Sequence, residues 1–152
     1  MRNIAGAHFF RGNSYQAKGD LKRAIADYNK AIGLNPKDGD FYINRGAAHF
    51  AVKEFDLAIK DESNAIALKP EKPEPYNNRG NAYVRLGKRE QAVEDYSKAI
   101  SLSPEDATYY VNRGYAYFLE EYNDKALLDY SKALELDSEN KEAKSYLIIL
   151  GP

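Results

Sequence analysis

Apolar and small side chains recur along this chain at intervals of three and four residues, in segments separated by short polar turns. In residues 89–102, for example, Ala92, Val93, Tyr96 and Ala99 fall on one face of a helix. The pattern fills the chain from Ala5 onward and predicts an all-α protein. The predicted helices form pairs, whose first members cover residues 5–18, 39–52, 73–86 and 107–120 and whose second members cover residues 21–34, 55–68, 89–102 and 123–136.

The helix pairs are copies of one another. Glycines recur every 34 residues, and an Asn-Arg-Gly triplet ends at each of the last three; they are Gly12, Gly46, Gly80 and Gly114. A fixed period of this size indicates stacked repeats that bury each other's apolar faces. Counted from Ala5, the repeats occupy residues 5–38, 39–72, 73–106 and 107–140 without an insertion.

The second half of each repeat has its own shared positions. Alanine fills two of them in every copy, tyrosine a third in all copies but the second, and proline closes three copies: Ala24, Ala58, Ala92 and Ala126; Ala31, Ala65, Ala99 and Ala133; Tyr28, Tyr96 and Tyr130; Pro36, Pro70 and Pro104. With the glycines, these offsets resemble the tetratricopeptide repeat (TPR) family. The resemblance implies a right-handed α-solenoid of antiparallel helix pairs, a single domain over residues 1–152. Residues 141–150 are expected to form a capping helix over the fourth repeat.

Composition narrows the possible functions. The net charge is −1 and charged residues make up 30% of the chain, so nothing indicates binding to nucleic acid or to an anionic membrane. Without cysteine, the chain has no disulfides and no cysteine-based zinc site. No apolar run approaches the roughly 20 residues of a membrane helix, and the first repeat begins too early to leave room for a signal peptide. We expect a cytoplasmic protein that needs no cofactor.

Tyrosine is unusually frequent, with 13 residues. Aromatic side chains interleaved with basic ones can stack on single-stranded nucleic acid. Here the tyrosines follow the repeat period and no surplus positive charge accompanies them, which favours a role in packing. Nine occupy repeat-core positions: Tyr15, Tyr28, Tyr42, Tyr76, Tyr83, Tyr96, Tyr110, Tyr117 and Tyr130.

Each repeat carries an arginine where the resembled family usually has leucine, and an aspartate sixteen residues later. The pairs are Arg11 and Asp27, Arg45 and Asp61, Arg79 and Asp95, and Arg113 and Asp129. A row of arginines could bind phosphate or carboxylate groups of a ligand. The constant spacing instead favours an Arg–Asp ion pair inside each helix pair, because a partly buried guanidinium requires a partner.

His49 and Glu62 stand where the other repeats carry tyrosine, and both fall in the second repeat. We expect them to face each other across one helix pair. A His–Glu pair could act as a general acid and base or as half of a metal site. No nucleophile, third ligand or Gly-rich phosphate loop accompanies it, so we interpret it as a polar substitution within a packed layer. The chain is predicted not to be an enzyme.

The resemblance places a binding surface on the concave face of the first helices. Asparagine occupies the sixth position of three repeats, as Asn44, Asn78 and Asn112. Asparagine is a mediocre helix former, so helix stability does not explain this choice. Its amide carries both a donor and an acceptor and can therefore bind a peptide backbone bidentately. The alternative is that these asparagines are merely solvated or were inherited by repeat duplication. The predicted peptide-binding residues are Asn13, Asn44, Asn77, Asn78, Asn81, Asn112, Phe9, Phe50, Arg85, Tyr115 and Phe118.

Family members that hold acidic chaperone C-terminal tails do so with a clamp of lysine, asparagine and arginine residues. The corresponding positions here carry no cation in either register: Phe9, Asn13, Asn44, Glu74 and Asn78, or Ile43, Ala47, Asn78, Thr108 and Asn112. Such a tail is therefore not the expected partner. We expect instead a scaffold that binds an extended peptide or partner segment in the concave groove. The alternative is self-assembly through the terminal faces, since Leu147–Leu150 is apolar on several sides and could make a homo-oligomer.

Overall fold

The computed structural model describes residues 4–151, and most of these residues lie in α-helices. No strand occurs in that part of the chain. The all-α fold predicted from the sequence is therefore confirmed. In chain order the helices are α1 (Ile4–Ala17), α2 (Leu21–Leu34), α3 (Gly39–Ala51), α4 (Phe55–Leu68), α5 (Pro73–Arg85), α6 (Arg89–Leu102), α7 (Ala107–Leu119), α8 (Asn123–Leu136) and α9 (Lys141–Leu150).

The repeat period also predicted the ends of the helices. The second helix of every pair has the predicted bounds, and each first helix ends one residue earlier than predicted. The turn inside each pair contains one residue with positive φ: Gly19 at 77°, Lys53 at 66°, Gly87 at 73° and Glu121 at 61°. A left-handed conformation costs an L residue about 1–2 kcal/mol. Lys53 and Glu121 therefore keep the same turn as the two glycines, but at an energetic cost.

Short polar side chains begin several helices. The Asp38 carboxylate accepts a hydrogen bond from the backbone N–H of Asp40 at 3.1 Å, and Asp106 accepts one from Thr108 at 2.9 Å. Both follow a proline that cannot continue the preceding helix. In the first helix pair, Asp20 accepts from the backbone N–H of Arg23 at 3.1 Å. These contacts satisfy N–H groups that have no partner within the helix itself.

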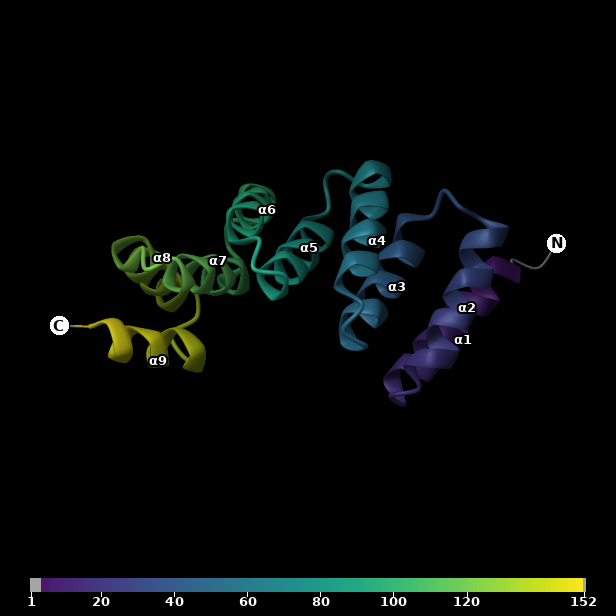
Figure 1. Ribbon diagram of the computed structural model, residues 1–152, viewed down its shortest axis with the longest axis horizontal. Helices are drawn as coiled ribbons and strands as arrows, with labels where there is room; N and C mark the ends of the chain where they lie inside the picture. Colours follow the sequence, from purple (N-terminus) through teal and green to yellow (C-terminus); the bar gives the residue numbers. More distant parts are fainter. Residues whose placement is uncertain (1–3, 152) are drawn as a thin grey trace. The chain divides into compact units, whose positions relative to one another are not determined.

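The chain divides into two compact units, Met1–Glu71 and Lys72–Pro152. In the first unit, Ala24, Tyr28 and Ala48 form a buried cluster between α2 and α3. In the second unit, α6 and α7 enclose a corresponding cluster of Ala92, Tyr96 and Ala116 (Figure 1). Each helix pair thus buries its apolar face against the next pair of its own unit, as a repeat architecture requires.

A tyrosine ring explains the glycine in three of the repeats. A Cβ atom on Gly80 would lie 2.7 Å from Cε1 of Tyr96, closer than real Cβ contacts, and Gly114 meets Tyr130 in the same way. The ring lies against the first helix at the place where that helix has no side chain. The glycine therefore accommodates the buried tyrosine of its own repeat.

Helix α9 covers the end of the second unit and is drawn in yellow in Figure 1. Ala143 is fully buried against α7 and α8, and Tyr146, Leu147 and Leu150 pack around it. The expected capping helix is therefore confirmed. Its outer face carries Ile148 and Ile149, which are 82% and 63% exposed. Among the described residues, the helices are too short and too polar to cross a membrane.

Candidate functional site

Each repeat arginine is ion-paired with the aspartate of its own repeat. Arg79 Nε and Nη2 each donate to one carboxylate oxygen of Asp95 at 2.7 Å. The other three pairs have the same two-pronged geometry, with distances from 2.6 to 2.8 Å: Arg11 with Asp27, Arg45 with Asp61, and Arg113 with Asp129. The predicted ion pairs are therefore confirmed, and the arginines hold the two helices of each pair together.

Two of the arginines also join neighbouring repeats. Arg45 Nη1 donates to the side-chain oxygen of Asn29 at 2.7 Å, and Arg113 Nη1 donates to Ser97 at 3.0 Å. The hydrogen bond with Asp95 raises the pKa of Arg79, and hydrogen bonds from Arg11 lower the pKa of Asp27 to about 2. Both shifts favour the charged form of the group concerned.

In the second unit, the structure brings together asparagines of two first helices. Asn77, Asn78 and Asn81 lie on α5 and Asn112 lies on α7; we call this set the amide face. The Asn112 Nδ2 amide donates to Oδ1 of Asn77 at 2.7 Å. All four side chains are half-buried. Of the four predicted asparagines of this unit, Asn77 and Asn112 are thus joined by a hydrogen bond between α5 and α7.

Two predicted binding asparagines also serve the fold. The hydroxyl of Tyr28 donates to Oδ1 of Asn13 at 2.8 Å, and the hydroxyl of Tyr96 donates to Oδ1 of Asn81 at 2.7 Å. Burial raises the pKa of Tyr28 to about 12, so its hydroxyl keeps its proton and remains a donor. In the fourth repeat the asparagine is replaced by Tyr115, and the buried hydroxyl of Tyr130 has no hydrogen-bond partner within residues 4–151.

This difference predicts opposite effects of one substitution. Tyr96→Phe removes a buried hydrogen bond and leaves Asn81 without its donor, so it is expected to lower the free energy of unfolding by about 0.5–1.5 kcal/mol. Tyr130→Phe removes a buried hydroxyl without a partner and is expected to leave stability unchanged or raise it. Urea denaturation of both variants measures the difference. An equal loss in both would show that the hydroxyls contribute nothing through Asn81.

The other predicted residues lie in two different settings. In the first unit, Asn44 Nδ2 donates to the backbone carbonyl of Asp40 at 2.9 Å. Phe9 packs against Phe41, with ring centroids 4.9 Å apart, and Phe50 packs against Phe55 at 5.3 Å. The two phenylalanines therefore pack between helices of the first unit, and Asn44 bonds to the backbone of its own helix.

In the second unit, helix α9 reaches two of the predicted aromatic residues. The ring of Tyr146 lies 5.8 Å from that of Tyr115 and 5.3 Å from that of Phe118, and it stacks on Tyr130 at 4.8 Å. Arg85 at the end of α5 is exposed. Tyr115 and Phe118 therefore pack against the capping helix.

His49 is held by two carboxylates in the second repeat. Its Nδ1 lies 2.6 Å from Glu54, and its Nε2 lies 3.8 Å from Asp61, which also binds Arg45. Glu62 is 1% exposed and occupies the place of the missing tyrosine, because a Cβ on Gly46 would lie 2.7 Å from its Oε1. Within the described residues no three His, Cys, Asp or Glu side chains are grouped so that they could hold a metal ion.

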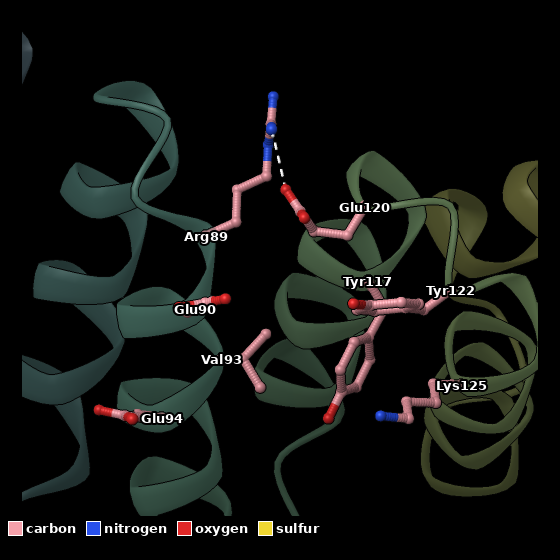
Figure 2. Close-up of a pocket in the computed structure, with 8 residues that line it drawn as sticks. All are labelled: Arg89, Glu90, Val93, Glu94, Tyr117, Glu120, Tyr122 and Lys125. Carbon is pink, nitrogen blue, oxygen red and sulfur yellow. Dashed lines mark hydrogen bonds and ion pairs between the residues drawn. The ribbon is translucent and has the colours of Figure 1, made fainter.

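Sequence analysis missed a pocket that α6, α7 and α8 form in the second unit (Figure 2). Its volume is about 330 Å³, and it is lined by Arg89, Glu90, Val93, Glu94, Tyr117, Glu120, Tyr122 and Lys125. The sequence did contain a signal for it. Arg89 replaces the Leu21 and Phe55 of the earlier repeats, Glu120 replaces the Val52 and Leu86 of the second and third, and the two side chains bind each other at 2.9 Å.

Comparison with known sequences covers most of the chain. Residues 12–53, 53–87 and 80–120 match the family described as TPR repeat, and residues 107–140 match the one described as Tetratricopeptide repeat. No curated protein matches the sequence.

Solved structures with the same fold include a crystal structure of MamA, which is 31% identical to this chain with a TM-score of 0.85. That match covers 93% of this chain and 82% of MamA. The first TPR domain of Spaghetti (RPAP3), described as bound to the HSP90 peptide SRMEEVD, is 28% identical over 78% of this chain and 96% of its own, with a TM-score of 0.75. The Arabidopsis OM64 TPR domain is 28% identical over 74% of this chain and 93% of its own, with a TM-score of 0.72.

Proposed function

The chain belongs to the tetratricopeptide repeat family, whose matches run from residue 12 to residue 140, and on this premise we propose that it is a protein-interaction scaffold. Its ligand is an extended peptide segment of a partner protein. We assign the binding surface to the amide face of the second unit. The structural relative that is described with a bound HSP90 peptide supports a peptide as the ligand.

The hydrogen bond between Asn112 and Asn77 is the observation that carries this assignment. It uses the amide nitrogen of Asn112 and the carbonyl oxygen of Asn77. The Asn112 carbonyl oxygen and the Asn77 amide nitrogen take part in no other hydrogen bond in the described part of the chain. One can accept from a peptide N–H and the other can donate to a peptide C=O. Such a pair would bind the peptide backbone of a ligand whatever its side chains are.

Selectivity would come from the neighbours of the amide face. Arg85 is the cation at one end of α5, and Glu74 near the other end is an exposed carboxylate. The positions that would clamp an acidic chaperone tail carry Glu74 and Thr108 instead of cations. We therefore propose a ligand without a run of acidic residues, although the relative named above is described with an HSP90 peptide.

The experiment begins with peptides selected from a random display library on the full chain. Asn77→Ala combined with Asn112→Ala is expected to weaken a selected peptide by about tenfold or more, because two hydrogen bonds of roughly 0.5–1.5 kcal/mol each are lost. The fold should remain, since alanine is the better helix former. Asn123→Ala on α8, an exposed asparagine outside the amide face, is the matched control and should leave the dissociation constant unchanged.

Two results would contradict the assignment. The first is an unchanged dissociation constant in the double variant. The second is an equal loss in the Asn123→Ala control, which would show that the effect does not come from the amide face. Thermal denaturation of the variants excludes unfolding as the cause of a loss.

A second candidate function is self-assembly, favoured by the exposed Ile148 and Ile149 on α9. Exposed apolar side chains that lie side by side on a helix are typical of a contact between proteins. Light scattering over a concentration series measures the association state. If self-assembly is the function, Ile148→Lys abolishes a concentration-dependent increase in mass; a constant monomer mass in the unmodified chain rules this candidate out.

A further inference from the structure

The pocket between α6, α7 and α8 is independent of the amide face, because none of its lining residues belongs to that face. Figure 2 shows two opposite walls. Glu90, Val93 and Glu94 project from α6, and on the other side Tyr117 projects from α7, Tyr122 from the turn before α8, and Lys125 from α8. A volume of about 330 Å³ is at the small end of ligand pockets. It suits one long side chain rather than a large cofactor.

The aromatic wall already holds an ammonium group. The rings of Tyr117 and Tyr122 meet edge to face, with centroids 6.5 Å apart. The Nζ atom of Lys125 lies 5.4 Å from the centroid of the first ring and 5.1 Å from that of the second. Both distances are within the range of a cation–π interaction. The pocket therefore presents both aromatic rings to the ammonium group of the chain's own exposed lysine, while Arg113 also lies 5.9 Å from the Tyr117 ring.

The charged residues that line the pocket favour binding of a cation. Arg89 and Glu120 neutralise each other at the rim, at 2.9 Å. Of the remaining lining residues, Glu90 and Glu94 are negative and only Lys125 is positive. Because Lys125 is exposed, its flexible side chain can leave the rings without disturbing the core. The carboxylates would then favour an incoming cation over an anion.

Tyr122 occupies a position at which the fold alone would favour another residue. It is the N-cap of α8 and makes no capping hydrogen bond. At the same repeat position Asp20 caps α2, while Glu54 and Lys88 make no capping bond either. A helix gives up stability when its N-cap side chain cannot accept a hydrogen bond. The ring of Tyr122 lines the pocket instead. The position therefore tolerates residues without a capping contact, and in the fourth repeat it places an aromatic ring in the pocket.

From the cavity, the ring geometry and the charges, we propose that this pocket binds the lysine side chain of a partner protein. The ammonium group takes the place of Lys125 over the two tyrosines, close to Glu90 and Glu94. The aliphatic part of the ligand side chain packs along Val93. This site would add a second contact with a partner, away from the amide face.

The test uses NMR titration of the full chain with a short peptide, blocked at both ends, in which one lysine is the only charged side chain, and with the same peptide carrying norleucine in place of the lysine. The lysine peptide is expected to shift the amide signals of Val93 and Tyr122, and the norleucine peptide is not. Lys125→Met removes the internal competitor and is expected to tighten binding about threefold, the size of one exposed cation–π contact. Tyr122→Ser supplies an uncharged N-cap, so it should raise the Tm while weakening binding about threefold or more.

The direction in which Lys125→Met changes the affinity for the lysine peptide tests whether Lys125 competes with the ligand. Weaker binding in this variant would show that Lys125 attracts the ligand, and the proposal would be wrong. Equal binding of the norleucine peptide, or no binding of the lysine peptide to either the unmodified chain or Lys125→Met, would also overturn it. Choline serves as a separate probe; binding of choline without binding of the lysine peptide would assign the pocket to a small quaternary amine instead.

Discussion

Asp95→Ala is expected to lower the free energy of unfolding by about 3 kcal/mol, the lower end of the range for breaking a buried ion pair. Asp95 is 6% exposed and accepts two hydrogen bonds from Arg79, whose side chain is 20% exposed. Removing the carboxylate deprives a largely desolvated guanidinium of two charged hydrogen bonds. For a chain of this size the loss corresponds to a decrease in Tm of roughly 6–12 °C. Thermal and urea denaturation measure it.

An exposed ion pair provides the matched control. Lys132 and Glu135 lie 2.8 Å apart on α8, with side chains 46% and 66% exposed. Glu135→Ala should cost less than about 1 kcal/mol, since solvent screens such a pair. Peptide binding should be unaffected by Asp95→Ala once the folded fraction is taken into account. A variant that keeps its stability but loses its ligand would show that Arg79 serves binding, contrary to our assignment.

Restoring the repeat pattern in the second repeat is expected to stabilise the protein by about 1–3 kcal/mol, because it removes a buried carboxylate from a packed layer. The change is Glu62→Tyr together with Ala47→Asn. Glu62 already lies against Gly46 as Tyr96 lies against Gly80, so the ring has a place. The new asparagine corresponds to Asn81, which accepts the hydroxyl of Tyr96.

The single change Glu62→Tyr separates the two contributions. Without an asparagine at position 47, the new hydroxyl is buried without an acceptor, and the gain should be smaller by about 0.5–1.5 kcal/mol. Urea denaturation of both variants provides the comparison. If the double variant is less stable than the unmodified chain, the Glu62 carboxylate contributes favourable contacts in the α3–α4 pair that outweigh the cost of its burial.

The sequence predicted the helices because one period governs the whole chain. Because the same pattern occurs four times, a helix end that is unclear in one repeat can be read from the others. The second helices were therefore predicted with their observed bounds. The Arg–Asp pairs were predicted for the same reason. A charge pair repeated four times at one spacing has a structural explanation that a single pair would not provide.

The sequence did not show which asparagines the fold itself uses. Asn81 precedes Tyr96 by fifteen residues, as Asn13 precedes Tyr28, but only the packing of the ring under the first helix shows that the hydroxyl reaches the amide. The contact of Tyr146 with Tyr115 and Phe118 depends on where α9 lies. The pocket was not predicted because its lining residues come from three helices. They also differ between the repeats, and a comparison of repeats shows only the positions that the copies share.

Backbone recognition by the amide face is the central claim, and an N-methyl scan of a selected peptide tests it most directly. Each peptide N–H is methylated in turn, and the dissociation constant is measured with the unmodified chain and with Asn112→Ala. We predict that one methylation weakens binding to the unmodified chain by about two- to twelvefold, because the Asn112 carbonyl oxygen loses its peptide N–H donor, and that it has little effect on Asn112→Ala. A scan in which no methylation matters, or in which the same loss appears in Asn112→Ala, would contradict the account.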